Sequence, residues 1–285
     1  MNSVKYAAPS TIEGVCSLLS QHGERAAVLS GGQSLLPAAR EQELPCDVLV
    51  DINGLEAQSY VEIVDGDLHI GCLARHVTVA TSDLIRAELP VLAAMAGTIG
   101  DVQVRNQGTL CGALAEADPT GDPPVVALLL EAELAAISLD SERALSAATF
   151  FQDLGETALT PAEFVSEVRF PLPGADTGSA YERWTPNEGA YPVATVGVAL
   201  TVKDTITDAN IVVGSVEGKP APMPTVADRL SGAAPTEEAF VDAARALGSA
   251  VDPVANHEGG PEFKREITTT LAKDALVTAA ERAGV

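Results

Sequence analysis

Residues 103–122, QVRNQGTLCGALAEADPTGD, decide the interpretation of this chain. The stretch holds Gly108 and Gly112 close together and lies next to an apolar run at residues 125–130. Glycine has no Cβ, so a loop of this composition lets backbone N–H groups approach the phosphate of a ligand. Taken alone, the stretch also fits an ordinary junction between two buried elements.

A stretch of the same kind occurs earlier, at residues 29–37, LSGGQSLLP, directly after a predicted strand at residues 26–29. One such loop is a common turn. Two of them in one chain predict a diphosphate that is held from two sides, as in a dinucleotide such as FAD. Neither loop fits G-x-G-x-x-G or G-x-x-x-x-G-K-[ST], which disfavours the Rossmann and Walker interpretations.

Length and charge exclude several classes of function. A chain of 285 residues predicts two or three subdomains. A formal net charge of −23 argues against nucleic-acid binding, because phosphate backbones require a basic surface. No run of about 18 apolar residues occurs, so we expect no integral membrane segment. The first residues lack the pattern of a secretory signal, and we expect a cytoplasmic protein.

The 40 acidic residues are spread along the whole chain rather than gathered in a tail. One interpretation is an ordinary acidic protein. The other is adaptation to high salt, in which a hydrated carboxylate surface keeps the protein in solution and salt screens its self-repulsion. The sequence leaves both interpretations open.

Cysteine and histidine spacing predicts no metal site. The four cysteines, Cys16, Cys46, Cys72 and Cys111, are scattered singly and form no C-x-x-C pair. We expect three of the four to be small core residues. The sequence also predicts no catalytic nucleophile, since no Ser-His-Asp or Cys-His arrangement is recognisable.

The first part of the chain reads as two subdomains. Residues 1–55 form a predicted β-α-β unit, with strands at 4–7, 26–29 and 47–53. Its helix would begin at a capping box of Ser10 and Glu13, continue to Gln21 and end at Gly23. Residues 56–173 contain a predicted hairpin at 61–70, helices at 78–85, 89–96 and 125–130, and strands at 134–139 and 164–173.

A linker at residues 174–178, GADTG, predicts a separate C-terminal domain at residues 179–285. Strands are expected at 180–184, 193–202 and 209–216, and helices at 226–230, 237–247 and 263–282. Strands followed by helices, rather than alternating with them, favour an α+β domain with a three-stranded antiparallel sheet.

Together, the run IGDVQVRNQGTLCGALAEADPTGDPP, the segment SGGQSLLP and the region Tyr181-Glu182-Arg183 resemble one family. It comprises the FAD-binding medium subunits of molybdenum hydroxylases, including aerobic carbon monoxide dehydrogenase and xanthine dehydrogenase. The family patterns are similar to A-G-G-x-S-L-L-P and R-N-x-G-T-I-G-G-x-L-A-x-A-D-P-x-x-D, and the resemblance covers essentially the whole chain. It implies an α+β fold, with a two-lobed FAD-binding domain of the PCMH type and a C-terminal domain of the carbon monoxide dehydrogenase flavoprotein type.

The resemblance implies FAD as the cofactor and assigns this chain no catalytic residue. Two groups of residues would hold the pyrophosphate: Leu29, Ser30, Gly31, Gly32, Gln33, Ser34 and Leu35 from the first loop, and Thr109, Leu110, Cys111, Gly112 and Ala113 from the second. Asp122 would accept hydrogen bonds from the cofactor, and Val165 would pack near the adenine or the flavin ring. Arg183, at or near the family's lysine, would stabilise a reduced flavin.

The sequence departs from the family pattern at four positions. Cys111 stands where the first glycine of G-G is expected, which would crowd the backbone slightly. Glu116 replaces a frequent histidine, Gly121 replaces an alanine and Arg183 replaces a lysine. These departures affect the tuning of the flavin rather than its binding. Arg105 and Asn106 match the pattern, and we expect them to order the loop by bonding to backbone groups.

The resemblance also implies partners. Electrons would pass from a large molybdopterin-binding subunit, through a small [2Fe–2S] subunit, to this flavin and on to a quinone, NAD⁺ or oxygen, in a dimer of heterotrimers. Two alternatives stay open at this stage: a free-standing FAD-dependent reductase or oxidase, and a nucleotide-binding or scaffold protein without a flavin. The sequence does not identify the oxidised substrate.

Overall fold

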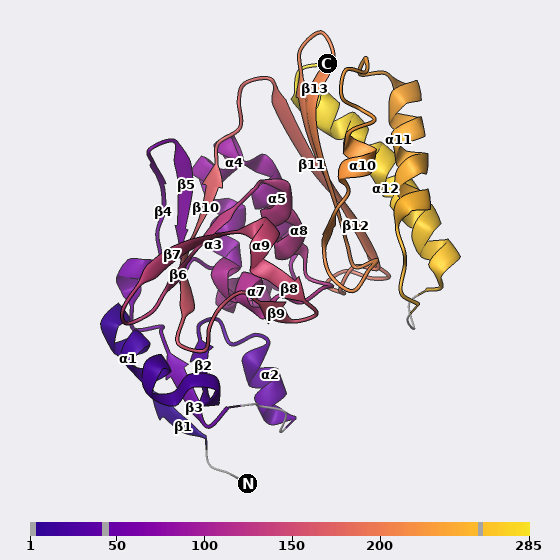
Figure 1. Ribbon diagram of the computed structural model, residues 1–285. Coiled ribbons are helices and arrows are strands. Elements are labelled where there is room, and N and C mark those ends of the chain that lie inside the picture. Colours follow the sequence, from indigo (N-terminus) through magenta and orange to yellow (C-terminus); the bar gives the residue numbers. More distant parts are fainter. Residues whose placement is uncertain (1–3, 42–45, 256–258) are drawn as a thin grey trace.

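The computed structural model describes residues 4–41, 46–255 and 259–285, which fold into three units that follow one another along the chain (Figure 1). The N-terminal unit lies at one end of the molecule, and the C-terminal helices lie at the other. This arrangement confirms the prediction of a mixed helix and sheet fold. Within the described part, no helix combines the length and the apolar character that a membrane crossing requires.

A three-stranded parallel sheet with the order β1-β3-β2 forms the first unit. Its elements are β1 (Lys5–Ala7), α1 (Ile12–His22), β2 (Ala26–Leu29), α2 (Leu35–Arg40) and β3 (Val48–Asp51). The predicted capping box at Ser10 is wrong, because Thr11 is the N-cap and accepts a hydrogen bond from the Gly14 amide at 3.1 Å. Strand β2 ends at Leu29, so the first glycine loop starts directly at the edge of the sheet.

The second unit is built on a five-stranded antiparallel sheet with the order β4-β5-β10-β6-β7. Its strands are β4 (Val61–Val64), β5 (Asp67–Gly71), β6 (Glu133–Ile137), β7 (Glu142–Ser146) and β10 (Phe164–Pro171). The β4–β5 pair confirms the predicted hairpin. The sequence did not predict β7, because this edge strand is mostly exposed and shows no apolar alternation.

Helices of the second unit connect its strands and carry the second glycine loop. They are α3 (His76–Thr81), α4 (Asp83–Glu88), α5 (Pro90–Thr98), α6 (Val102–Gln107), α7 (Leu110–Glu116), α8 (Asp122–Leu129) and α9 (Ala147–Phe150), followed by a small sheet of β8 (Phe151–Asp153) and β9 (Glu156–Thr157). The prediction of one helix at 78–85 is wrong. Ser82 has an extended backbone that ends α3, and its hydroxyl caps α4 by accepting from the Ile85 amide at 3.4 Å.

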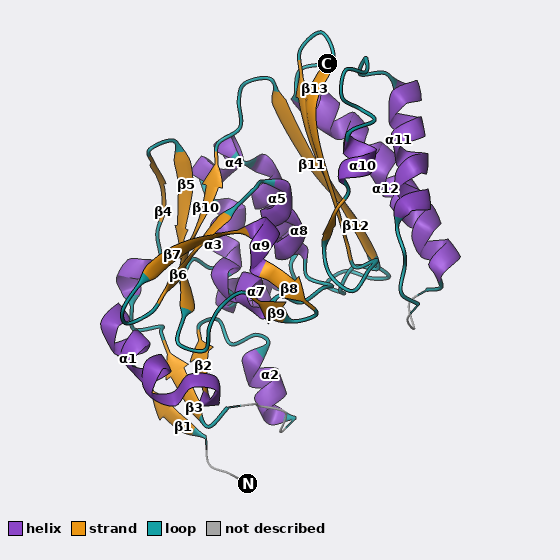
Figure 2. Cartoon of the chain, in the orientation of Figure 1, coloured by secondary structure: helices purple, strands orange, loops and turns teal. Residues whose placement is uncertain are grey.

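The third unit is an antiparallel sheet covered by helices (Figure 2). It contains β11 (Thr177–Trp184), β12 (Ala194–Val202), β13 (Ile206–Gly214), β14 (Ala221–Pro222), α10 (Pro224–Ala227), α11 (Glu237–Ala250) and α12 (Pro261–Arg282). The sheet therefore has four strands, and the prediction of three is wrong. Strand β14 is only two residues long and includes a proline, so it leaves no periodic pattern in the sequence.

Two hydrophobic cores hold these units together. The first spans the N-terminal and middle units, and the second fills the space between β11–β13 and the helices α10–α12. On the other face of that sheet, Leu129 of α8 packs so closely on Gly197 that a Cβ there would lie 3.0 Å from its Cδ2. The middle and C-terminal units are therefore joined by tight packing as well as by the chain.

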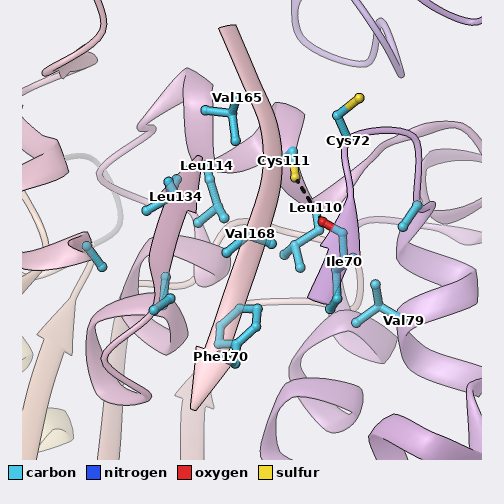
Figure 3. Close-up of a cluster of buried hydrophobic side chains, with 14 of the residues drawn as sticks. Ile70, Cys72, Val79, Leu110, Cys111, Leu114, Leu134, Val165, Val168 and Phe170 are labelled. Atoms are coloured by element: carbon cyan, nitrogen blue, oxygen red, sulfur yellow. Dashed lines mark hydrogen bonds between the residues drawn. The ribbon is translucent and has the colours of Figure 1, made fainter. Parts of the chain in front are cut away.

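All four cysteines are buried and unpaired, and Cys16, Cys72 and Cys111 belong to the first core, which confirms the prediction for three of the four. Cys111 lies among the apolar side chains between α7, β5 and β10, and its Sγ donates to the Ile70 carbonyl at 3.8 Å (Figure 3). Burial raises the pKa of the Cys72 thiol to about 12 and that of Cys111 well above its usual value. Both thiols therefore stay protonated and unreactive at neutral pH.

Candidate functional site

A cavity of about 650 Å³ opens where the three units meet. Its lining comes from the first glycine loop, from the second glycine loop with α7 and the start of α8, and from Arg183 with residues 189–192. The volume lies within the range of roughly 300–1,000 Å³ that is typical of small-molecule sites. Meeting points between domains are frequent locations for such sites.

The two glycine loops touch at one side of this cavity. Ser30, directly after β2, places its Oγ 3.0 Å from Oγ1 of Thr109, the N-cap residue of α7. A Cβ on Gly31 would lie 2.5 Å from the Gln107 carbonyl oxygen and 2.6 Å from Cα of Gly108. The backbones therefore approach as closely as they do because residue 31 is glycine.

The first loop presents unused backbone donors. The amides of residues 31–34 donate to no acceptor within the described part of the chain, and all four residues line the cavity. Gly32 has a φ of +68°, in the left-handed region that favours glycine. Consecutive free amides in a turn of this kind form a concave site for an anion. The donor set thus fits the diphosphate of a dinucleotide.

A buried ion pair forms another part of the lining. Asp122, the first residue of α8, is 5% exposed and accepts a hydrogen bond from the Tyr181 hydroxyl through Oδ1. The same oxygen lies 3.5 Å from Nε of Arg183, whose other nitrogens donate to the carbonyls of Thr98 and Ala190 at 2.8 and 3.0 Å. Burial raises the pKa of Asp122, although Arg183 and Tyr181 work in the opposite direction.

Acidic and aromatic side chains line the wall next to α7. Glu116 accepts a hydrogen bond from the Ser34 hydroxyl at 2.5 Å, which links the two loops a second time. Burial raises the pKa of Glu116, as does the charge of Asp118. Tyr191 is 58% exposed and lines the cavity beside these carboxylates. Such a wall suits hydroxyl or amine donors of a ligand rather than its phosphates.

The structure brings together most of the predicted FAD-binding residues. The cavity lining includes Ser30, Gly31, Gly32, Gln33, Ser34, Leu35, Thr109, Cys111, Gly112, Ala113, Asp122, Val165 and Arg183. Leu29 and Leu110 do not line it, because both side chains are buried, that of Leu110 in the first core. The side chain of Cys111 is directed to the Ile70 carbonyl, and the crowding expected there stays a prediction.

Arg105 and Asn106 confirm the structural role predicted for them. Arg105 donates to the carbonyls of Ile99 and Gly100, each at 2.9 Å, and Asn106 donates to the Val102 carbonyl at 2.7 Å. Both side chains therefore order the segment that leads into the second glycine loop.

Sequence reasoning missed His76 and Tyr191, which also line the cavity. His76 is a lone histidine after a predicted hairpin, and nothing in its spacing points to a ligand. Tyr191 gives a stronger signal, since it is an aromatic residue directly before Pro192 in a segment without helix or strand periodicity. Aromatic residues in such loops often contact ligands.

The His76 ring packs against Gly108 of the second glycine loop. The side chain is 3% exposed, and a Cβ on Gly108 would lie 2.8 Å from its Cδ2. Its Nδ1 is buried without a hydrogen-bond partner in the described part of the chain. Burial lowers the pKa of His76 to about 4, so the ring is neutral at neutral pH.

We expect acid to destabilise the protein partly through His76. In the unfolded chain a histidine has a pKa of about 6.5, so between about pH 6.5 and pH 4 the unfolded state binds a proton that the folded state excludes. Stability is then lost as the pH falls through this window, by up to about 3 kcal/mol. Urea unfolding at several pH values should give a shallower pH dependence for His76→Asn. An unchanged dependence would contradict this role.

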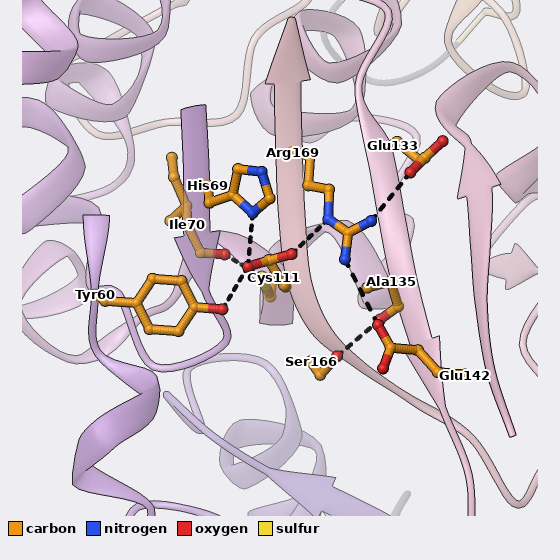
Figure 4. Close-up of polar contacts among 10 residues, drawn as sticks. Tyr60, His69, Ile70, Cys111, Glu133, Ala135, Glu142, Ser166 and Arg169 are labelled. Atoms are coloured by element: carbon orange, nitrogen blue, oxygen red, sulfur yellow. Dashed lines mark hydrogen bonds and ion pairs between the residues drawn. The ribbon is translucent and has the colours of Figure 1, made fainter. Parts of the chain in front are cut away.

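A polar cluster elsewhere on the five-stranded sheet does not face the cavity (Figure 4). Glu167 of β10 accepts hydrogen bonds from Tyr60 and Arg169, each at 2.5 Å, and pairs with Nδ1 of His69 at 3.0 Å. Arg169 also reaches Glu133. Burial works to raise the pKa of Glu167, but these hydrogen bonds hold it below the usual value. The cluster is fully paired and ties β5, β10 and β6 together.

Two protein-family models match this chain, and together they cover most of it. The family model for the FAD binding domain in molybdopterin dehydrogenase matches residues 2–173. The model for the CO dehydrogenase flavoprotein C-terminal domain matches residues 179–279.

Relatives and solved structures agree with these matches. The chain is similar to the glyceraldehyde dehydrogenase medium chain of Sulfolobus acidocaldarius, with 32% identity over 250 residues that cover 87% of this chain and 88% of the relative. It is 30% identical over 281 residues to the nicotine 6-hydroxylase medium subunit of Paenarthrobacter nicotinovorans, with 98% of both chains covered. A solved structure of carbon monoxide dehydrogenase from Hydrogenophaga pseudoflava, lacking the Mo-pyranopterin moiety of the molybdenum cofactor, matches with a TM-score of 0.94 and 30% identity over 98% of both chains.

Proposed function

The chain belongs to the family of FAD-binding subunits of molybdopterin dehydrogenases, and we propose that it holds one FAD between its two glycine loops as an electron carrier. One observation carries the proposal. The contact between Ser30 and Thr109 joins the loops at the edge of a cavity that free amides line. A catalytic nucleophile is not needed for this task, because the flavin itself performs the redox chemistry.

The diphosphate is assigned to the glycine loops. The free amides of residues 31–34 would donate to its oxygens, and the start of α7 would face it from the other side. Hydrogen bonds to a charged group contribute about 1.5–3 kcal/mol each, so several of them hold a dianion firmly. The carboxylates of Glu116 and Asp118 also line the cavity and would repel phosphate, so the phosphates are assigned to the amides nearer the Ser30–Thr109 contact than to Ser34, whose hydroxyl donates to Glu116.

The remaining lining residues suit the other parts of the cofactor. Val165 and Tyr191 offer apolar and aromatic surface to a flat ring, and Oδ2 of Asp122, which has no hydrogen-bond partner in the described residues, can accept from a ligand donor. Bound FAD would supply the redox chemistry, since a flavin takes up and releases one or two electrons. Arg183 is fixed by two carbonyls and would place a positive charge that favours a reduced, anionic flavin.

The proposed partners follow from the relatives. Both curated relatives are named as medium chains or subunits, so we propose that this chain also works in a complex with a large molybdopterin-binding subunit and a small [2Fe–2S] subunit, in a dimer of heterotrimers. The names of the relatives and of the matched structure mention glyceraldehyde, nicotine and carbon monoxide. Complexes that act on different substrates therefore share one medium-subunit fold. We propose that the large subunit determines which substrate the complex oxidises.

We expect the purified full-length chain to bind one FAD per chain, and ADP to compete with it, because both ligands carry the diphosphate that the free amides would hold. FMN lacks the second phosphate and the adenosine, and it should bind at least about a hundredfold more weakly. Equilibrium dialysis and flavin absorbance measure both affinities. A chain that takes up no FAD, or that binds FMN as tightly as FAD, would disprove the assignment.

The same preparation separates this proposal from a free-standing reductase or oxidase. As an electron carrier, the lone chain with bound FAD should show no steady turnover with the substrates of molybdenum hydroxylases. Turnover should appear only when the partner subunits are present. Steady turnover by the lone chain would favour the free-standing enzyme.

A further inference from the structure

Arg75 is the one side chain of the turn between β5 and α3 that reaches towards both glycine loops. Its Nη1 donates to the carbonyl of Gln107, at the start of the second loop. Its Nη2 donates to Oδ1 of Asn53 at 2.6 Å. The planar guanidinium thus joins two acceptors that come from different units of the fold.

Asn53 continues this connection to the first loop. Its Nδ2 donates to the Ser30 carbonyl at 2.9 Å and to Oδ1 of Asp51 at 2.6 Å. In a trans peptide the C=O and the following N–H point in opposite directions. Because Asn53 holds the Ser30 carbonyl, the Gly31 amide of the same peptide points away from Asn53 and stays free, on a residue that lines the cavity.

The backbone of residues 74–76 also binds the second loop directly. Arg75 forms an isolated antiparallel bridge with Thr109. The His76 amide donates to the Gly108 carbonyl at 2.9 Å, and the Leu110 amide donates to the Ala74 carbonyl at 3.2 Å. Residues 74–76 therefore fix the position of the second loop, and the Arg75 side chain relates that position to the first loop.

The charges along this connection are balanced. Partial burial of Asp51 works to raise its pKa, but hydrogen bonds from Tyr6 and Asn53 and the charge of Arg75 lower it overall. Asp51 is therefore ionised and orients Asn53, while Arg75 carries the matching positive charge.

We propose that Arg75, acting through Asn53, is a positioning residue for the flavin nucleotide: it sets the two glycine loops at the separation at which their amides hold a diphosphate. This inference rests on the proposed function. Arg75 itself does not line the cavity. The forked guanidinium donates to both acceptors at once. A lysine at this position carries a single point charge and should not hold both acceptors in the same geometry.

The test uses full-length apoprotein and compares dissociation constants for FAD and ADP with the melting temperature without ligand. For Arg75→Lys we expect both dissociation constants to rise by at least about tenfold, because two charge-assisted hydrogen bonds are lost. The apoprotein should still fold, with its melting temperature lowered by several degrees, and the dissociation constants are compared well below that temperature. The matched control is Arg86→Lys, whose Nε bonds only to the nearby Ala80 carbonyl and which should bind FAD like the unmodified chain.

A second variant approaches the connection from its other end. Asn53→Ala leaves residues 74–76 intact and should weaken FAD binding about as much as Arg75→Lys, and the double variant should be no weaker than either single one. Additive losses, or Arg75→Lys binding FAD and ADP like the unmodified chain, would overturn the inference. If the unmodified chain binds FAD in these experiments, that result leaves the proposed function intact.

Discussion

Gly31→Ala is expected to abolish FAD retention, raising the dissociation constant at least about a hundredfold. A Cβ at this position would lie 2.5 Å from the Gln107 carbonyl oxygen, 2.6 Å from Cα of Gly108 and 3.0 Å from the Thr109 amide nitrogen. All three atoms belong to the backbone, so no side-chain rotation relieves the clash. The loops must separate, which breaks the Ser30–Thr109 contact and spreads the amides that face the diphosphate.

A matched control for this variant lies on the same side of the molecule. Gly54→Ala adds the same methyl group after β3, where the nearest atom, the Pro9 carbonyl oxygen, is 3.6 Å away. It should retain FAD and melt like the unmodified protein. The comparison is made by flavin absorbance after gel filtration and by the melting temperature of each apoprotein. If Gly31→Ala retains FAD like Gly54→Ala, the close approach of the loops is not what holds the cofactor.

Local patterns predicted individual elements closely, both beside the cavity and away from it. The helix expected at 263–282 is found at Pro261–Arg282, and the strand expected at 26–29 is β2. Both have apolar residues at regular spacing and clear ends, so each is determined by its own residues. The glycine loops are also recognisable from their own residues, because glycine is needed where the backbone approaches another segment closely.

Features that depend on distant contacts were missed. Ser82 divides the predicted helix by ending α3 and capping α4, but a single serine within an apolar pattern does not by itself predict such a break. Arg75 is one of many charged residues in the sequence, and only the fold brings Asn53 and Gln107 to its two ends. Sequence spacing therefore located residues that line the cavity, while the residues that hold those surfaces in place needed the structure.

Asp122 has two roles, of which the sequence predicted one. Its motif predicted that it faces a ligand, and the structure shows that it also joins the middle unit to the C-terminal unit. It belongs to α8 in the middle unit, and Tyr181 and Arg183, which engage it, belong to β11 in the C-terminal unit. The Arg183 side chain is only 15% exposed, so it depends on this carboxylate for charge compensation. The same groups thus form one wall of the cavity and part of the junction between two units.

Asp122→Ala is accordingly expected to lower the free energy of unfolding by about 3–5 kcal/mol, the range for removing one partner of a buried ion pair. It leaves a mostly buried guanidinium without its carboxylate and the Tyr181 hydroxyl without its acceptor. Asp122→Asn keeps an acceptor for Tyr181 and should cost less, about 1–3 kcal/mol. Urea unfolding of the apoproteins measures both values.

The double variant Asp122→Ala/Arg183→Met decides whether uncompensated charge is the cause. Removing the guanidinium as well should restore part of the stability, because the remaining methionine fills the space without a charge. Additive losses would show that packing, and not charge, governs this wall. Since Arg183 also donates to the carbonyls of Thr98 and Ala190, the recovery should be incomplete, and the shortfall measures how much these two hydrogen bonds contribute to the junction.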